Sequence, residues 1–372
     1  NTAIGYGSLE NNTTGTSNVA VGRDALEATT GNANVGVGHQ AGKANTSGQI
    51  IAIGYQTMQS NTTGTRNIAI GGNAYDSSDT ENDNLAIGHN AMTANTAGGT
   101  KNVAIGNYSL DVLTSGDDNV AVGYISLSAN TTGSNNTALG SWSLTANTTG
   151  VSNTAVGTDS MDSNTDGNYN VAVGADALQA NSTGHRNVAI GHTALNDNTV
   201  SDNIGIGQQA GYSITTGTRN IAIGTNALDD TDTENDNLAI GYNAMTTNTA
   251  GGIQNVAVGN YALDALTSGD NCVAIGHGAL GGNTTAESNV AIGSGAGSDV
   301  TTAQTGVYIG LNTNPGDGTT SNNAIVIGSN FTGGGNTFSF GKGSNVVSNV
   351  FTSNATFARN SDLHKKTNIE ST

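Results

Sequence analysis

The sequence predicts an all-β fold, a parallel β-solenoid whose turns are each about 17 residues long. Three observations predict it: a short motif recurs at nearly constant spacing, apolar residues alternate within the motif, and no segment has a helical period. The motif is Asn, an apolar residue, Ala, then Val or Ile, and a closing Gly, as in NVAVG at 18–22 and NIAIG at 67–71. A fixed short period of this kind is typical of solenoids.

The closing glycine of the motif returns every 16 to 18 residues, most often every 17, and marks 20 similar units. A longer repeat is superimposed on the units. Segment 63–99 returns nearly unchanged as 216–252, displaced by 153 residues or nine units of 17, which indicates duplication of a block. The closing glycines are at positions 5, 22, 38, 54, 71, 88, 106, 123, 140, 157, 174, 191, 207, 224, 241, 259, 276, 293, 310 and 328.

Each motif predicts a short strand that ends at its glycine. In NIAIG, Ile68 and Ile70 share one face of the strand and Ala69 lies on the other, while Gly71 allows the backbone to turn. We expect the Ile and Val pairs to be interior. We expect the Ala column to pack tightly and to let a neighbouring chain approach closely.

A second short strand is expected a few residues later, where a small residue precedes a large one, and a polar loop, typically NTTG, follows it. Units of 17 residues are too short for a βαβ crossover, and no Asn is followed by Gly, so hairpins are disfavoured. Parallel stacking of like on like remains, with Asn over Asn at about 4.8 Å per unit. The small-large pairs are Ala25-Leu26, Ala91-Met92, Ala177-Leu178 and Ala227-Leu228.

The internal core of such a coil is thin, because each unit offers only about three sizeable apolar side chains against the entropy of ordering the whole unit. We therefore expect the chain to form a homo-oligomer, and a homotrimer is the usual closed form of a fibre. Burial of the Ala column between chains would supply the missing contacts.

Composition excludes several classes of function. The net charge of −18 argues against nucleic acid as a partner. No apolar run approaches the ~20 residues of a membrane-spanning helix, so no membrane insertion is expected, and no signal peptide is visible. The single cysteine, Cys272, is predicted to be a small buried side chain. No cofactor is expected. The chain starts inside a repeat without Met, which favours a piece of a longer polypeptide.

Composition changes after Gly310. The only proline, Pro315, and all five phenylalanines lie beyond it, the latter as Phe331, Phe338, Phe340, Phe351 and Phe357. We therefore divide the chain into a shaft of solenoid repeats at 1–310 and a C-terminal β cap at 311–360 that closes the trimer. An irregular last turn followed by a linker is the alternative for the second segment.

The motif NVAIG, as at 102–106 and 187–191, resembles the head repeat of trimeric autotransporter adhesins, the YadA-like head. It looks equally like the shaft repeats of marine and cyanobacterial phage tail fibres. The resemblance covers about residues 1–328 and implies a left-handed parallel β-roll in a trimer. The adhesin repeat is shorter than 17 residues, so the handedness stays open.

The segment SDLHKKTNIE at 361–370 resembles the first residues of the endosialidase-type intramolecular chaperone domain of phage tailspikes and tail fibres. In that family the chaperone trimerises the fibre and then cuts itself off just before the serine. The resemblance therefore implies that 361–372 begin such a domain, with Ser361 as nucleophile and Lys366 as general base. His364 and Lys365 depart from the Arg and Leu that members often carry. The alternative is a charged, solvated tail.

Two further groups of residues were considered as sites. Asp76, Asp79, Glu81 and Asp83, in the acidic loop at 76–84, carry the oxygen ligands that Ca²⁺ prefers. Their spacing matches no known calcium loop, and we favour a solvated acidic loop and no metal. Ring-bearing residues often follow the closing glycine, with Trp142 one position further. We favour ordinary stacking for them over contact with a sugar receptor. They are Tyr6, His39, Tyr55, His89, Tyr124, His192, Tyr242 and His277.

The predicted function is that of a structural bacteriophage tail-fibre shaft, located in the virion and extracellular, without substrate turnover along the shaft. Its expected partners are two further copies of the chain, other virion tail proteins, and a glycan or protein receptor on the host cell surface. The first alternative is the head of a bacterial trimeric surface adhesin. Further alternatives are an ice-binding solenoid and a polysaccharide depolymerase.

Overall fold

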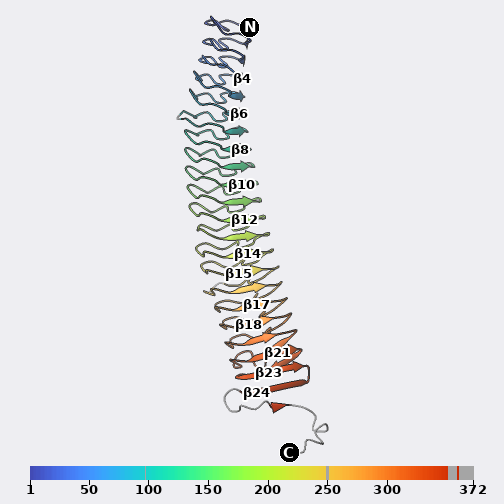
Figure 1. The fold of residues 1–372 in the computed structure, drawn as a ribbon. Coiled ribbons are helices and arrows are strands. Elements are labelled where there is room, and N and C mark those ends of the chain that lie inside the picture. The colour runs from blue at the N-terminus through green and yellow to red at the C-terminus, as the bar shows by residue number, and fades with distance from the viewer. Residues whose placement is uncertain (97, 249–250, 351–357, 360–372) are drawn as a thin grey trace, which may run out of the picture. The chain divides into compact units, whose positions relative to one another are not determined.

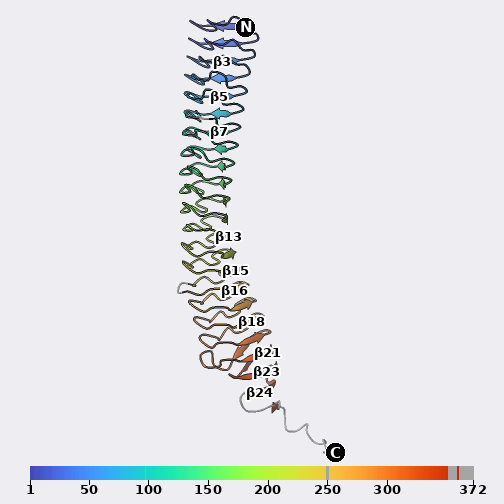
Figure 2. The ribbon, with the colours of Figure 1, turned by 60° about the vertical axis from the view of Figure 1, so that its left-hand side comes forward.

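A computed structural model of the chain describes residues 1–96, 98–248, 251–350 and 358–359. The described residues contain strands and turns and no helix. The chain divides into two compact units, Asn1–Asp202 (unit 1) and Asn203–Thr372 (unit 2). Within each unit, short strands stack one above another along the chain (Figures 1 and 2). The predicted all-β parallel solenoid, with its repeat of about 17 residues, is confirmed.

The strands of unit 1 are three residues long and recur once per coil. They are β1 Thr2–Ile4, β2 Val19–Val21, β3 Val35–Val37, β4 Ile51–Ile53, β5 Ile68–Ile70, β6 Leu85–Ile87, β7 Val103–Ile105, β8 Val120–Val122, β9 Thr137–Leu139, β10 Thr154–Val156, β11 Val171–Val173 and β12 Val188–Ile190. Each strand pairs in parallel with the next, and equivalent residues face each other, as Ala172 faces Ala189. Like is therefore stacked on like.

The strands of unit 2 begin with the same parallel arrangement. These are β13 Ile204–Ile206, β14 Ile221–Ile223, β15 Leu238–Ile240, β16 Val256–Val258, β17 Val273–Ile275, β18 Val290–Ile292, β19 Val307–Ile309, β20 Thr313–Pro315, β21 Ile325–Ser329, β22 Phe331–Gly333, β23 Thr337–Lys342, β24 Asn345–Val350 and β25 Ala358–Arg359. Strands β19, β21 and β23 still pair in parallel, and β20 pairs with β22 in a second small sheet.

The region that we assigned to a cap, 311–360, thus contains two more parallel strands of the main sheet before the pattern changes. Strand β24 pairs with β23 antiparallel, and β25 pairs with β24 antiparallel. An antiparallel hairpin ends the run of parallel coils, because the chain turns back on itself there and does not go round again.

The face of each strand that points inward is the opposite of the one we expected. The central Ala is fully buried in strand after strand, including Ala69, Ala172 and Ala189. The flanking Val and Ile residues are half-buried or exposed, with Ile190 38% and Ile275 40% exposed. The prediction that the Ile and Val pairs are interior was wrong, whereas tight packing of the Ala is confirmed.

The second predicted strand is a turn segment. The large residue of each small-large pair has a left-handed backbone, as at Leu26 (φ 50°) and Leu178 (φ 55°), which a strand does not permit. The pair is still buried, and its backbone still bonds to the next coil: the Leu178 N–H donates to the Ala194 carbonyl at 2.9 Å. The prediction of a second strand was therefore wrong.

The core is a complementary pair of walls in which a large side chain from the turn segment meets a small one from the strand. Gly36 takes the place of Ala in β3, and even a Cβ there would lie 2.7 Å from Leu26 Cγ. The reverse arrangement occurs in unit 2, where Tyr308 is buried at the strand centre and Gly297 replaces the large residue opposite. A Cβ on Gly297 would lie 3.0 Å from the Tyr308 ring. The interior volume therefore allows one large residue per coil at this level.

The closing glycines are required by contact between coils. Gly174 has φ 140°, and a Cβ on it would lie 2.4 Å from the carbonyl oxygen of Gly191 in the next coil. Only glycine fits both this backbone conformation and this approach.

Two ladders of buried asparagines run along the coils. In the first, at the start of each strand, Asn153 donates from Nδ2 to the Gly167 carbonyl at 2.7 Å and accepts the Asn170 N–H at 3.0 Å. In the second, in the NTTG loops, Asn147 Nδ2 donates to Asn130 Oδ1 at 3.0 Å. These side chains replace the backbone partners that a tight coil lacks. Loop asparagines of the NTTG segments, such as Asn130 and Asn147, are therefore structural and buried.

Removal of one ladder side chain is expected to destabilise unit 1. Asn153→Leu leaves the buried Asn170 N–H without a partner and removes one of the two side-chain hydrogen bonds to the Gly167 carbonyl, the other being from Asn164, which should lower the free energy of unfolding by about 2 kcal/mol. Urea unfolding followed by circular dichroism measures the change. Thr149→Leu, at an exposed loop position, is the control and should change it by less than about 0.5 kcal/mol.

Asn153→Cys should cost less than Asn153→Leu, because Cys272 naturally occupies the same ladder position in unit 2. Its N–H donates to Asn255 Oδ1 at 2.8 Å, and its Sγ lies 3.2 Å from the Ala286 carbonyl oxygen. Equal unfolding midpoints for Asn153→Leu and Thr149→Leu would contradict a stabilising ladder.

Candidate functional site

An apolar face is formed by the outward residues of the strands. We use this name for the first and third residues of β2–β12 in unit 1, which are Val, Ile, Leu or Thr and include no charged residue. The equivalent residues of β13–β19 continue the pattern in unit 2. Soluble monomers rarely leave a contiguous apolar surface of this length open to water. The face is therefore the first candidate functional surface of the molecule.

The ring-bearing residues after the closing glycines form stacked rows where consecutive coils carry them. In unit 1 the row contains His89, Tyr108, Tyr124 and Trp142, with ring centroids 5.6, 6.3 and 5.6 Å apart. In unit 2 the row contains Tyr242, Tyr261 and His277, at 5.5 and 5.7 Å. We call these two sets the aromatic rows. The prediction that rings stack here is confirmed, but Tyr108 and Tyr261 lie one position beyond the register that we counted.

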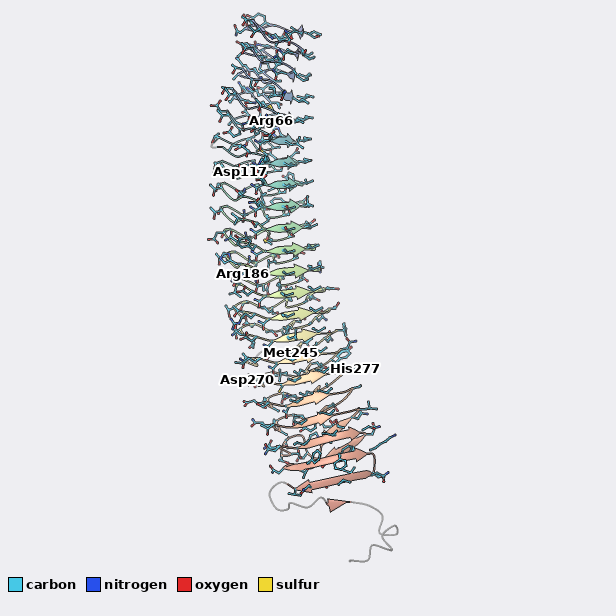
Figure 3. All side chains as sticks on the ribbon, in the orientation of Figure 1. Arg66, Asp117, Arg186, Met245, Asp270 and His277 are labelled. Atoms are coloured by element: carbon cyan, nitrogen blue, oxygen red, sulfur yellow. The ribbon has the colours of Figure 1, made fainter. Side chains whose placement is uncertain are left out.

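Rings in the aromatic rows meet edge to face rather than in a flat stack, with interplanar angles of 66° to 87°. Figure 3 shows His277 on the side of unit 2 toward which the strands run, and Asp270 on the opposite side. The rows thus follow the edge of the coil beside the ends of the strands, away from the loop edge.

The acidic loop at 76–84 does not gather its carboxylates into one site. Glu81 is buried and folds back, so that its carboxylate accepts the N–H groups of Asp79 at 2.9 Å, Thr80 at 3.0 Å and Gly98 at 3.1 Å. Glu234 does the same in the duplicated block, for the N–H groups of Asp232, Thr233 and Gly251. Glu81 stands one coil after the loop glycine Gly64, and Ser78 stands one coil after the loop asparagine Asn61. Sequence reasoning had not found this role of the glutamate.

The other three carboxylates of that loop have separate surroundings. Asp83 accepts two hydrogen bonds from Arg66, at 2.5 and 2.7 Å, and these lower the pKa of Asp83. Asp79 accepts a hydrogen bond from the Thr62 hydroxyl. Burial raises the pKa of Asp76. Over the part of the chain that the structure describes, no three His, Cys, Asp or Glu side chains come together in a way that could hold a metal ion.

Arginine-aspartate pairs join consecutive coils at the loop edge. Arg186 Nε lies 2.7 Å from Asp202 Oδ1, and Arg219 Nε lies 2.6 Å from Asp236 Oδ1, as in the Arg66 pair. Figure 3 places Asp117 and Arg186 on the same side of unit 1. Both side chains of each pair are partly exposed, so the ion pair contributes little to stability. The pairs nevertheless distinguish coils that are otherwise alike, which favours the correct register.

Cys272 is buried, as predicted. Burial is the main reason that the pKa of its thiol is raised. Such a thiol stays protonated and unreactive at neutral pH, so this residue has a structural role in the ladder.

Ser361 and Lys366, the predicted catalytic pair, lie outside the described residues. Their role stays a prediction from resemblance. When the gene is expressed with its full natural C-terminal region, we expect a released fragment that begins at Ser361, measurable by intact-mass spectrometry. Ser361→Ala and Lys366→Ala should leave the chain whole and still trimeric, because folding precedes cutting in this scheme.

An unprocessed wild-type product that carries a complete downstream domain would disprove the catalytic assignment. Ser353→Ala, which changes a serine of the neighbouring segment, is the control and should be processed like the wild type.

Among the described residues no helix is long and apolar enough to cross a bilayer. In the comparisons with known proteins, no family model, no curated protein and no solved structure matches this chain.

Proposed function

We propose that this chain is the structural shaft of an attachment fibre, a homotrimeric bacteriophage tail fibre that acts outside the cell as part of the virion. The observation that supports it best is the apolar face. A coil whose outward strand residues are Val, Ile, Leu or Thr, half-buried or exposed and with no charge among them, has the surface of a subunit and not of a finished monomer.

A second copy of the same chain is the partner that fits this face. Its outward residues repeat at the same spacing of about 4.8 Å per coil, so side chains of two copies can pack in register along the whole face. Burying the exposed part of each outward side chain contributes roughly 0.5–1 kcal/mol. Over β2–β12 this reaches on the order of 10 kcal/mol, which offsets the entropy lost on association.

Contact through the Ala column, which we had expected from the sequence, is replaced by contact through Val and Ile. Because Ala is interior, it is not available to a neighbouring chain. Three copies around a common axis would turn their apolar faces inward and leave the loop edges, with their Arg-Asp pairs, in water. Closed symmetry of this kind also covers the exposed sheet without leaving a surface that recruits further copies.

Placement in a virion rests on the resemblance of residues 361–370 to the opening of a tail-fibre chaperone domain. No chemistry is assigned to the shaft, since its carboxylates are dispersed or bonded within loops. A shaft would hold a recognition tip at a distance from the particle and connect it to other tail proteins.

Three measurements test the proposal. Sedimentation equilibrium of the purified chain should give a mass three times 37.0 kDa. Antibodies raised against unit 1 should label the fibres of phage particles in electron micrographs, and mass spectrometry of purified particles should find the chain. A monomer at micromolar concentration would overturn the trimer. Detection on bacterial cell surfaces, together with absence from particles, would instead favour the adhesin head.

A further inference from the structure

The aromatic rows are not needed for the fold. Coils without rings at these positions carry small or polar residues there, such as Thr158 and Asp159, yet they keep the same parallel register. Rings are instead concentrated in consecutive coils. They occupy equivalent places 153 residues apart, the spacing of the longer repeat: His89 corresponds to Tyr242, and Tyr108 to Tyr261.

The rings are open to solvent except Tyr108, which is half-buried. Tyr124 is 45% and Trp142 43% exposed, and the rings of unit 2 are similarly accessible. Neighbouring rings meet edge to face, so the row presents both ring faces and ring edges with their polar atoms. The row in unit 1 therefore offers four rings in line, with successive centroids 5.6, 6.3 and 5.6 Å apart.

We propose that the aromatic rows bind an uncharged glycan chain, one chain on each row. Pyranose rings have apolar C–H faces that pack on the electron-rich face of an aromatic ring. Their hydroxyl groups would meet the Tyr hydroxyls, the Trp142 indole N–H and the imidazole of His89. A linear glycan matches a linear row because both repeat at regular intervals.

Carboxylates beside the rows support the assignment. Asp111 lies three residues after Tyr108, is half-buried, and has one side-chain oxygen without a hydrogen-bond partner among the described residues. In unit 2, Asp264 holds the equivalent place. It lies close enough to His277 for the imidazole to favour its ionised form, although burial dominates and raises the pKa of Asp264. Carboxylate acceptors next to exposed rings suit sugar hydroxyls and amides.

The charge of the chain selects among glycans. With a net charge of −18, the protein repels acidic polysaccharides, and no cluster of Lys or Arg lies in the rows. An uncharged glycan is therefore favoured over a sialylated or uronic-acid polymer. This inference deepens the proposed attachment role, because the shaft itself would contact host glycans, but binding in solution does not depend on incorporation in a virion.

Trp142, the only tryptophan of the chain, reports on the row in unit 1 directly. Chitohexaose and maltohexaose are the uncharged probes, and oligosialic acid is the acidic probe. We expect at least one uncharged probe to shift and quench the Trp142 emission with saturation at millimolar concentration or below, and oligosialic acid to have no effect. Calorimetric titration should give up to two sites per chain, one for each row.

Replacement of the central rings tests the site. Tyr108→Ser with Tyr124→Ser should weaken binding at unit 1 by about tenfold or more, as loss of stacked rings does. Tyr242→Ser with Tyr261→Ser should remove the second site only. Tyr169→Ser is the matched control and should bind as the wild type does, because Tyr169 is 62% exposed but belongs to neither row.

Circular dichroism confirms that each variant is folded. Binding of no uncharged probe, or equal binding by the Tyr108/Tyr124 variant, would overturn the inference. Trp142 emission that depends on protein concentration and not on glycan would assign the row to contact between copies. A monomer that still binds the uncharged probe would disprove the trimer and leave this inference standing.

Discussion

Ala189→Arg is expected to abolish the native fold of unit 1 around β12. Ala189 is fully buried at the centre of its strand, paired with Ala172 of β11. The core at this level holds one large side chain per coil, from the turn segment, so an arginine has neither space nor a partner for its charge. The expected loss is more than about 4 kcal/mol, since an unpaired buried charge adds to the steric cost.

The measurement is urea unfolding of purified protein, or the soluble yield where the variant does not fold. Thr132→Arg places the same side chain in an exposed NTTG loop and should unfold within about 0.5 kcal/mol of the wild type. Ala189→Gly should be intermediate, because Gly36 occupies this position naturally in β3. Equal stability of the two arginine variants would mean that Ala is not interior.

Three lysines on the apolar face are expected to separate the copies without unfolding them. Val156, Val173 and Ile190 are outward residues of β10, β11 and β12. Replacing all three by Lys removes apolar contact area and places like charges opposite one another in every pair of copies. We expect association to weaken by roughly 100-fold or more, so that the chain sediments as a monomer at micromolar concentration.

The matched control carries the same three charges at the loop edge. Thr132→Lys, Thr149→Lys and Thr183→Lys lie at exposed loop positions and should leave the oligomer intact. Circular dichroism of both variants should match the wild type. If the triple variant of the apolar face remained a trimer, the contact between copies would have to use another surface.

The two predictions together separate the two faces of one strand. Both substitutions introduce long cationic side chains into β12 or its neighbours, one inward and one outward. Only the inward one should affect folding, and only the outward one should affect association. If Ala189→Arg affected only association and the three lysines affected only folding, Val and Ile would be interior and Ala would face the neighbouring copy, as the sequence first suggested.

The repeat itself was sufficient to predict the class of fold, the position of the strand in each motif, the parallel register and the stacking of Asn on Asn. These properties follow from local rules: a period of 17 excludes a crossover helix, alternation indicates a strand, and identical units stack best on themselves. The glycine that closes each motif, such as Gly174, indicates a turn whether or not the neighbouring coil is known.

The inward face could not be decided in this way. Alternation separates Val171 and Val173 from Ala172, but both sets are apolar, and larger side chains ordinarily suggest the interior. The turn segment on the opposite side of the coil decides which face of the strand points inward. Leu178 and its equivalents in the turn segments fill the coil, so only Ala or Gly fits across from them, and Val and Ile are left outside. This depends on the distance between two walls, which the order of residues does not contain.

The turn segments and the glutamates also depend on tertiary contacts that the order of residues does not show. The small-large pattern of Ala177-Leu178 predicted a strand, and the pair is indeed buried and bonded to the next coil. Its left-handed backbone at Leu178 follows from closing the coil in so few residues. Glu81 was grouped with three aspartates by proximity in sequence, but the adjacent coil brings the Gly98 N–H to its carboxylate. The sequence alone determined what stacks on what, and the tertiary structure decided which side faces inward, because that depends on how the walls of one coil divide a fixed volume.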